Sequence, residues 1–339
     1  MGLASLQLSD SRVTAPSAAP ETCLEEICAR HGLPSPYVNS AQEASEVFAQ
    51  LGFCVVRNVF SEEDLVKFDE FTMQCVGHVD QQLVGDQSGS QFSRGVGRTS
   101  LSGLVDNFFE VEAFQALVQH AVLIDCLDQI YQQFRHDKGW VFAQGTGDIV
   151  QPGVNEFQQL HSDASRFRPY RHDSWSQDSH GAPESHPLLV SACPVAGNGF
   201  SVENGATVVI PWAELTALGV EADVYDRVCD RDLGWTETPS YWQLCRAVAS
   251  RGDLFLRDIC LPHAGAPNLS ALPRTMLAVI AYDQRFMVSN GHMPRHKTLP
   301  DDVWNSMEDN VKAKCDWIWS PCASTSRLAR FFVQEAARL

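Results

Sequence analysis

The spacing of apolar positions changes partway along the chain. Up to about residue 134 they recur at helical intervals, most clearly over residues 109–134, where Phe114 and Leu117 begin the stripe. After that point, short apolar runs bounded by Gly and Pro take over, which is typical of strands. Strands spaced in this way predict an all-β core with flanking helices, packed as an antiparallel sandwich or jelly roll. The runs are residues 140–143, 155–160, 188–195, 206–210, 253–259 and 275–282.

Two helix starts precede these strands. Ser40 and Glu43 form a capping-box pattern ahead of a short helix, in which a hydroxyl and a carboxyl satisfy free amides of the first turn. Ser61 and Asp64 repeat this pattern ahead of a second helix. Between them, residues 52–59 are compact and rich in β-branched side chains, which predicts a strand.

The chain is expected to form one domain with additions at its ends. Residues 1–36 are rich in Ala, Ser and Pro without sustained periodicity, which predicts a flexible arm. Residues 37–339 form the domain, and its tail from about residue 301 returns to helical composition. The polar insert 166–187 follows a candidate ligand pair, so we expect it to be a lid or binding loop.

Composition limits the classes of partner. Hydrophobic residues make up 44% and charged residues 20% of the 339 residues, which are globular values. A formal net charge of −17, without a cluster of Lys and Arg, argues against a nucleic-acid partner. No apolar run is long enough to span a membrane. We therefore expect a small-molecule partner, and a homodimer stays open.

Cysteine usage points to a reducing compartment. The chain has 11 Cys residues and no Cys-x-x-Cys pair, which favours buried thiols over a disulfide scaffold or a zinc ribbon. The N-terminus lacks the basic flank and apolar core of a signal peptide. We expect a cytoplasmic protein. The ending Ala337-Arg338-Leu339 is close to a peroxisomal address, which is the alternative.

Two His-x-Asp triplets are candidate metal ligands, and their surroundings separate them. His78 and Asp80 lie at the end of a predicted helix, where side chains two apart point to different sides. His161 and Asp163 follow a predicted strand, where residues two apart share a face. Local geometry therefore favours His161 and Asp163, and His78 is expected to be an incidental surface residue.

A further His and an Arg complete the constellation. His263 follows the apolar run 253–259 in a compact turn, and Arg274 begins the next run, so a hairpin would hold them near each other. Two imidazoles and one carboxylate can hold Fe(II) on one face of its octahedron and leave the opposite face open. The Arg could then bind the carboxylate of an oxidant.

With these residues, the chain resembles the phytanoyl-CoA dioxygenase-like family of Fe(II)/2-oxoglutarate-dependent oxygenases. Four segments in the family's order carry the resemblance over most of the chain, from Gly52 to Tyr282. They are the opening strand and helix cap at 52–61, the first metal motif at 158–163, the central strand at 203–211 and the second metal motif at 252–274.

The resemblance implies a double-stranded β-helix, a cupin-like jelly roll, with iron bound by three side chains. It assigns Arg274 to the distal carboxylate of 2-oxoglutarate, and in one branch of the family positions matching Gln158, Thr207 and Arg98 also contact this co-substrate. Some members carry a Ser two residues beyond the distal His, where this chain has Gly265. The iron ligands that it implies are His161, Asp163 and His263.

The resemblance also implies the reaction. The cofactors are Fe(II), 2-oxoglutarate and O₂, and the products include succinate and CO₂. A related halogenating enzyme carries a small residue in place of Asp163, so the carboxylate implies hydroxylation, while desaturation, epoxidation and rearrangement stay open. The leading substrate class is a small, largely apolar metabolite of secondary metabolism, such as a terpenoid or alkaloid. The alternatives are α-hydroxylation of an acyl-CoA and a non-catalytic jelly-roll binding protein.

Overall fold

The fold is described from a computed structural model. It covers residues 23–83, 97–101, 105, 107–134, 139–158, 160–161, 163, 188–211, 245–284 and 299–319, with the side chains of residues 78–83 excepted. The insert 166–187, the first 22 residues and the ending Ala337-Arg338-Leu339 lie outside the described residues. The side chain of His78 does so too.

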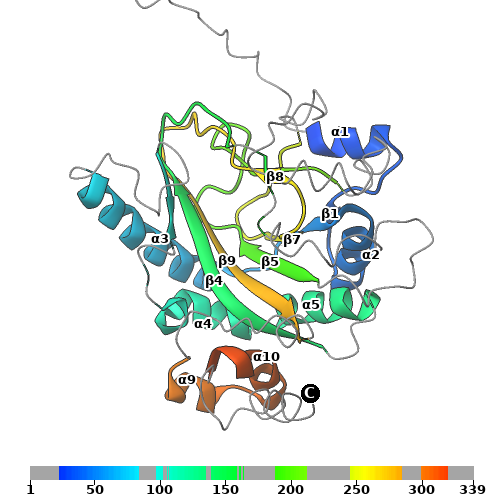
Figure 1. Ribbon diagram of the computed structural model, residues 1–339, viewed down its shortest axis with the longest axis vertical. Coiled ribbons are helices and arrows are strands. Elements are labelled where there is room, and N and C mark those ends of the chain that lie inside the picture. Colours follow the sequence, from blue (N-terminus) through cyan, green and yellow to red (C-terminus); the bar gives the residue numbers. More distant parts are fainter. Residues whose placement is uncertain are drawn as a thin grey trace, which may run out of the picture.

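A mixed seven-stranded sheet with flanking helices forms the body of the protein (Figure 1). Its strand order is β1-β2-β7-β5-β9-β4-β3, with β1 and β2 parallel and the other neighbours antiparallel. β6 and β8 form a separate two-stranded sheet. The strands are β1 Tyr37–Val38, β2 Phe53–Val56, β3 Arg98–Ser100, β4 Trp140–Val150, β5 Leu189–Pro194, β6 Val208–Val209, β7 Leu254–Asp258, β8 His263–Ala264 and β9 Arg274–Asp283.

The predicted strands are confirmed with one exception. The described residues of this segment, 155–158 and 160, form no regular strand, although an antiparallel bridge pairs Val154 with Asn268 on one side and another pairs His161 with His263 on the other. Between the bridges, the amide of Gln158 donates to the carbonyl of Gly265 at 2.8 Å. The segment is therefore held by isolated contacts with the chain around β8, and the prediction of a strand there is wrong.

The helices flank the large sheet, and α2 and α3 begin where the caps predict (Figure 1). Ser40 Oγ accepts from the Glu43 amide at 3.2 Å ahead of α2, and Ser61 Oγ accepts from the Asp64 amide at 3.2 Å ahead of α3. No helix among the described residues combines the length and hydropathy needed to cross a lipid bilayer. The helices are α1 Cys23–Arg30, α2 Ala41–Leu51, α3 Glu62–Leu83, the 3₁₀ helix η2 Phe108–Glu110, α4 Glu112–Gln119, α5 Ala121–Gln133, α9 Asp301–Ser306 and α10 Asp309–Trp319.

One helical prediction needs correction. The single helix expected over residues 109–134 is divided, because His120 takes an extended ψ of 115° and ends α4. Its ring packs 4.7 Å from that of Phe60, and no Gly or Pro marks the break. Within the arm expected over residues 1–36, Cys23–Arg30 form α1, which buries Leu24 and Ile27 in the core.

The two faces of the large sheet differ in chemistry. Directly opposed residues in antiparallel strands share a face, and the register places both Arg98 and Arg274 opposite Val150. Alternate positions along β4 add Asp148 to this face. Through Ser191 and β9, the same pattern adds Arg257 on β7. The opposite face is mainly apolar and is covered in part by α5, whose Tyr131 ring stacks on Trp140 with centroids 5.8 Å apart. The polar face is thus the one available for chemistry.

Close packing on the apolar face depends on Gly145. A Cβ at this position would collide with the Cβ and ring of Phe108 on η2. We expect Gly145→Ala to lower the free energy of unfolding by about 1–3 kcal/mol, the usual cost of overpacking. Chemical denaturation would measure this loss. Gly77→Ala is the control, because a Cβ there meets nothing within 4 Å and Ala favours the helix. Equal effects of the two changes would contradict the explanation.

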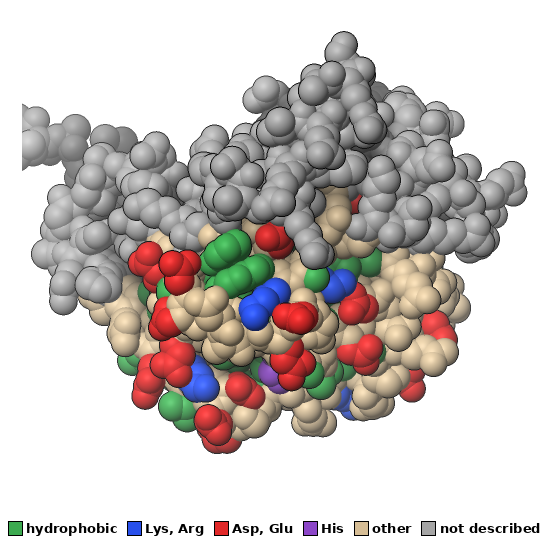
Figure 2. Space-filling view, turned by 90° about the horizontal axis from the view of Figure 1, so that it is seen from below, with side chains coloured by type: hydrophobic (Ala, Val, Ile, Leu, Met, Phe, Trp, Pro, Cys, Tyr) green, Lys and Arg blue, Asp and Glu red, His purple; other side chains and the backbone are tan. Residues whose placement is uncertain are grey.

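The surface agrees with the acidic composition. Figure 2 shows Asp and Glu side chains spread over one described face, with Lys and Arg side chains isolated among them. A nucleic-acid interface would instead gather basic side chains into a patch or stripe. The face in view offers no such patch.

Candidate metal centre

Three predicted ligands come together beside the polar face. His161, Asp163 and His263 each offer one ligand atom, and these atoms lie within 4.8 Å of one another. His161 Nε2 is 3.6 Å from Asp163 Oδ1, and His263 Nε2 is 3.2 Å from Asp163 Oδ2. No other group of three potential ligand side chains converges in this way within the described part of the chain. The spacing suits a single metal ion.

The backbone holds the two imidazoles together directly. The amide of His161 donates to the carbonyl of His263, and the reverse bond is also present, each at 2.9 Å. Their rings lie 4.4 Å apart between centroids. The Asp163 amide donates to the carbonyl of Ile259 at 3.1 Å, so the backbone of Asp163 is held just beyond the end of β7.

The predicted hairpin between His263 and Arg274 is wrong. His263 lies in β8, which pairs with β6, and Arg274 begins β9 in the seven-stranded sheet. The loop between β8 and β9 leads from one sheet to the other, so the two residues share no ladder. The two residues therefore belong to different sheets.

The electrostatics of the triad favour a bound cation. Burial, with help from the adjacent Arg257, lowers the pKa of His263 to about 4. Burial alone would raise the pKa of Asp163, but His263, Arg257 and His161 together hold that pKa well below its ordinary value. At neutral pH these two residues therefore present a neutral imidazole and an anionic carboxylate, the forms that bind metal without first releasing a proton.

Arg274 is a buried cation that lacks an anionic hydrogen-bond partner among the described residues. The residue is 4% exposed, its Nε has no hydrogen-bond partner there, and its Nη1 lies 3.9 Å from Met276 Sδ. Burial lowers the pKa of Arg274, and the nearby Asp148 opposes that effect. A buried guanidinium normally pairs with an anion. Its surroundings therefore suit an anionic ligand.

The other predicted co-substrate residues lie in two places. Thr207 is close to Arg274, because its Oγ1 also lies 3.9 Å from Met276 Sδ. Gln158 and Arg98 meet instead at Gly265: Gln158 Oε1 accepts from the Gly265 amide at 2.9 Å, and Arg98 Nη2 donates to the next carbonyl, that of Ala266, at 2.7 Å. Arg98 and Gln158 thus hold the backbone beside the metal ligands.

A family model decides the affiliation of the chain. The model for phytanoyl-CoA dioxygenase (PhyH) matches residues 48–276, more than half of the sequence. The chain belongs to this family. The family uses Fe(II), 2-oxoglutarate and O₂, so the chain is a 2-oxoglutarate-dependent oxygenase or a related enzyme. No curated protein matches the sequence.

Solved structures with a similar arrangement include two of the α-ketoglutarate-dependent epimerase SnoN from nogalamycin biosynthesis. Each has a TM-score of 0.44 and 13% identity; one alignment covers 72% of this chain and 81% of that one, and the other, a complex with Fe³⁺, α-ketoglutarate and nogalamycin RO, covers 75% and 92%. EvdMO1 has a TM-score of 0.44 and 16% identity, over 70% of this chain and 49% of its own. The affiliation rests on the family model.

The side chains present fit the family's cofactors. Two imidazoles and one carboxylate form a donor set that suits Fe(II), and the geometry of His161, Asp163 and His263 provides it. Arg274 presents a buried fork that matches a carboxylate of 2-oxoglutarate.

Gly265 occupies a position where some members of the family carry Ser, and it is tightly packed here. A Cβ at this position would lie 2.5 Å from both Arg98 Nη1 and Gln158 Oε1. We expect Gly265→Ser to displace both side chains and to weaken 2-oxoglutarate binding by about tenfold or more, because positioning partners cost this much when lost. Anaerobic titration would measure the affinity. Unchanged affinity would show that the two side chains move aside without consequence.

The sequence alone did not single out Arg257. Its Nη2 lies 3.2 Å from Asp163 Oδ2, and its Nη1 lies 2.9 Å from His263 Nδ1. A signal was available, because Arg257 directly follows the apolar residues Leu254-Phe255-Leu256 within a strand that is buried on both faces. A charge at such a position usually has a specific partner.

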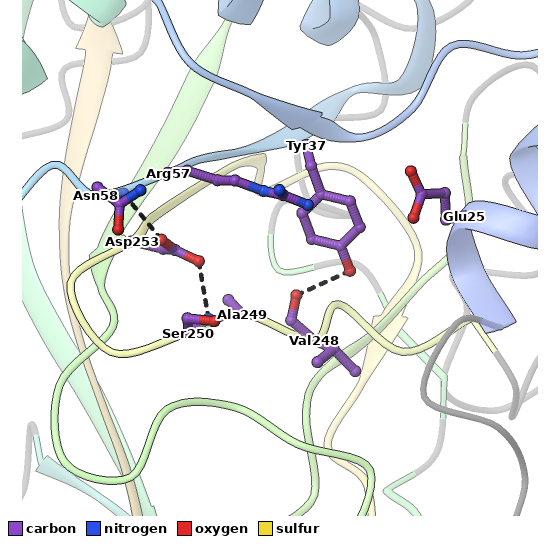
Figure 3. Close-up of a pocket in the computed structure, with 8 residues that line it drawn as sticks. All are labelled: Glu25, Tyr37, Arg57, Asn58, Val248, Ala249, Ser250 and Asp253. Carbon is purple, nitrogen blue, oxygen red and sulfur yellow. Dashed lines mark hydrogen bonds between the residues drawn. The ribbon is translucent and has the colours of Figure 1, made fainter.

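The structure also has a polar pocket of about 400 Å³ away from this centre, at the opposite end of β7 (Figure 3). Asp253, just before β7, accepts there from the amides of Asn58 at 3.0 Å and Ser250 at 2.8 Å. The Tyr37 hydroxyl donates to the carbonyl of Val248 at 3.0 Å. These hydrogen bonds connect the segment that leads into β7 with the segments around Tyr37 and Asn58. None of the predicted ligands lines the pocket.

Proposed function

We propose that the chain is an Fe(II)/2-oxoglutarate-dependent dioxygenase that oxidises an unactivated C–H bond of a small, largely apolar metabolite. His161, Asp163 and His263 hold the iron, and Arg274 binds the distal carboxylate of 2-oxoglutarate. The observation that carries the proposal is the pairing of a convergent triad with a buried Arg that has no anionic hydrogen-bond partner among the described residues.

The roles of the chain's residues follow from their positions. When bound, iron with 2-oxoglutarate and O₂ supplies an oxidant strong enough for an unactivated C–H bond. The three side chains would hold the metal and leave positions on it for small molecules. Arg274 fixes the co-substrate with paired, charge-assisted hydrogen bonds, and Thr207 lies next to it. Arg98 and Gln158 keep the backbone at Gly265 and Ala266 in place.

The two sheets are proposed to be the halves of a double-stranded β-helix. The two-stranded sheet lies against the polar face, since Thr207, just before β6, reaches Met276 on β9. His263 on β8 approaches Arg257 on β7 in the same way. A site between two sheets is sheltered from water, which strengthens its electrostatic interactions.

Within the described residues, the arginines at the site favour an apolar metabolite over an acyl-CoA, and Arg166, Arg168 and Arg171 lie outside these residues. The phosphates of CoA would need free basic side chains near the site. Two of the described arginines there are engaged, Arg98 by backbone carbonyls and Arg257 by Asp163. Turnover of phytanoyl-CoA in place of members of a terpenoid and alkaloid panel would reverse this preference.

Spectroscopy tests the reaction class directly. Anaerobic protein given Fe(II) and 2-oxoglutarate is expected to develop a charge-transfer absorption that neither component produces alone. Succinate in place of 2-oxoglutarate lacks the keto group and is the control. Absence of the band would overturn the oxygenase proposal and favour a non-catalytic binding protein. If the band is present, comparing the metabolites formed with the active enzyme and with the His161→Ala variant would identify the substrate.

A further inference from the structure

Arg257 is a buried cation in the middle of the large sheet. The register places it between Phe53 on β2 and Ser191 on β5, and it is 6% exposed. Removing a guanidinium from water is costly unless strong partners compensate. Its closest polar contacts are two of the proposed iron ligands, Asp163 and His263. The position of Arg257 is therefore tied to the metal centre.

Arg257 distinguishes the two oxygens of Asp163. Oδ1 faces His161 and Oδ2 faces His263, so either oxygen, or both, could meet an ion between the imidazoles. Arg257 Nη2 lies 3.2 Å from Oδ2. A guanidinium hydrogen bond occupies lone-pair density on Oδ2, whereas Oδ1 keeps its lone pairs for the metal.

The contact with His263 also leaves Asp163 as the hydrogen-bond acceptor of Arg257. Both Arg257 Nη1 and the carbonyl of Leu261 lie 2.9 Å from His263 Nδ1. A neutral imidazole nitrogen can donate or accept, but not both. If His263 binds the metal through Nε2, Nδ1 carries the proton and donates to Leu261. Arg257 then loses its acceptor on the ring, and Asp163 remains as its partner.

We propose that Arg257 is a positioning residue that holds Asp163 in one-oxygen ligation through Oδ1. This inference rests on the proposed function. Three protein atoms leave three positions on an octahedral ion, two for 2-oxoglutarate and one for a gas molecule. A carboxylate that ligates through both oxygens would occupy the third of these. Arg257 thus maintains the vacancy that the reaction needs.

Nitric oxide can bind at this open coordination position in the anaerobic Fe(II)·2-oxoglutarate protein. Its affinity therefore measures whether the position is open, without turnover. We expect Arg257→Gln to weaken nitric oxide binding by about tenfold or more, within the range for lost outer partners of a metal site. Arg257→Lys keeps a cationic donor and should recover part of the affinity. Arg251→Gln is the matched control, because Arg251 pairs with Glu62 and Asp69 and precedes β7, whereas Asp163 contacts the chain beyond its other end. Nitric oxide affinity within twofold of the unsubstituted protein in Arg257→Gln would overturn the proposal.

A double-mutant cycle tests whether Arg257 affects metal binding through Asp163. Arg257→Gln is expected to weaken Fe(II) binding roughly 10–100-fold, but to have little further effect in protein carrying Asp163→Ala. An equal loss in both backgrounds would show that Arg257 does not act through Asp163. Thermal unfolding of the metal-free variants checks folding, and the Lys variant still tests the proposal if the Gln variant is unstable. If the unsubstituted protein gave no charge-transfer band with Fe(II) and 2-oxoglutarate, the proposed function itself would fail.

Discussion

Replacing His161 with Ala is expected to abolish the charge-transfer absorption of the protein with Fe(II) and 2-oxoglutarate. The change removes one of three ligands and leaves Asp163 facing a gap where Nε2 was 3.6 Å away. Loss of a direct ligand should cost more than the roughly 10–100-fold loss of affinity typical of outer partners. Anaerobic titration with Fe(II), followed by 2-oxoglutarate, measures both the affinity and the band.

His31→Ala is the matched control for this experiment. His31 is exposed, directly follows the C-terminus of α1 and is not one of the three convergent side chains. His78→Ala is expected to leave the band intact as well, because the other His-x-Asp triplet is predicted to be incidental. A full band in the His161→Ala protein would remove His161 from the metal site.

Replacing Arg274 with Met is expected to separate co-substrate binding from stability. Each hydrogen bond to a charged group is worth about 1.5–3 kcal/mol, so losing a pair should weaken 2-oxoglutarate binding roughly 10²–10⁴-fold. The metal-free protein should become more stable, by about 1 kcal/mol or more, because an apolar side chain replaces a buried cation that has no anionic hydrogen-bond partner among the described residues. Titration and chemical denaturation measure the two effects.

Arg274→Lys refines this second test. Lys keeps the positive charge but lacks the planar fork, so we expect an affinity between those of the Arg and Met proteins. Fe(II) affinity in the absence of 2-oxoglutarate should change little in either variant, since Arg274 contacts no member of the triad. A Met variant with unchanged 2-oxoglutarate affinity would place the co-substrate elsewhere.

Local patterns in the sequence predicted local structure well. Ser40 and Ser61 cap the helices they were expected to cap, since a capping box depends only on residues within one turn. The apolar runs became strands wherever a neighbouring strand completes their hydrogen bonds. The run at 155–160 lacks a continuous partner strand, and no pattern within it could have shown this.

The residues of the site could be predicted from the sequence better than the way in which they are arranged. His-x-Asp spacing and the family's motifs selected His161, Asp163 and His263, and the structure brings them together. The strand and the hairpin invoked to explain their convergence are both absent. What holds the two imidazoles is a reciprocal backbone bridge between positions about a hundred residues apart. Such a contact depends on tertiary topology, which short-range spacing does not encode.

The short β8 strand has a consequence for the lifetime of the enzyme. His263 lies in a two-residue strand paired with the two-residue β6, whereas Arg274 belongs to the long ladder between β4 and β9. Few hydrogen bonds oppose the local opening of so small a sheet. Such opening would separate the imidazoles while the large sheet stays folded. We therefore expect metal loss to precede global unfolding, and amides around β8 to exchange with solvent faster than those of β9.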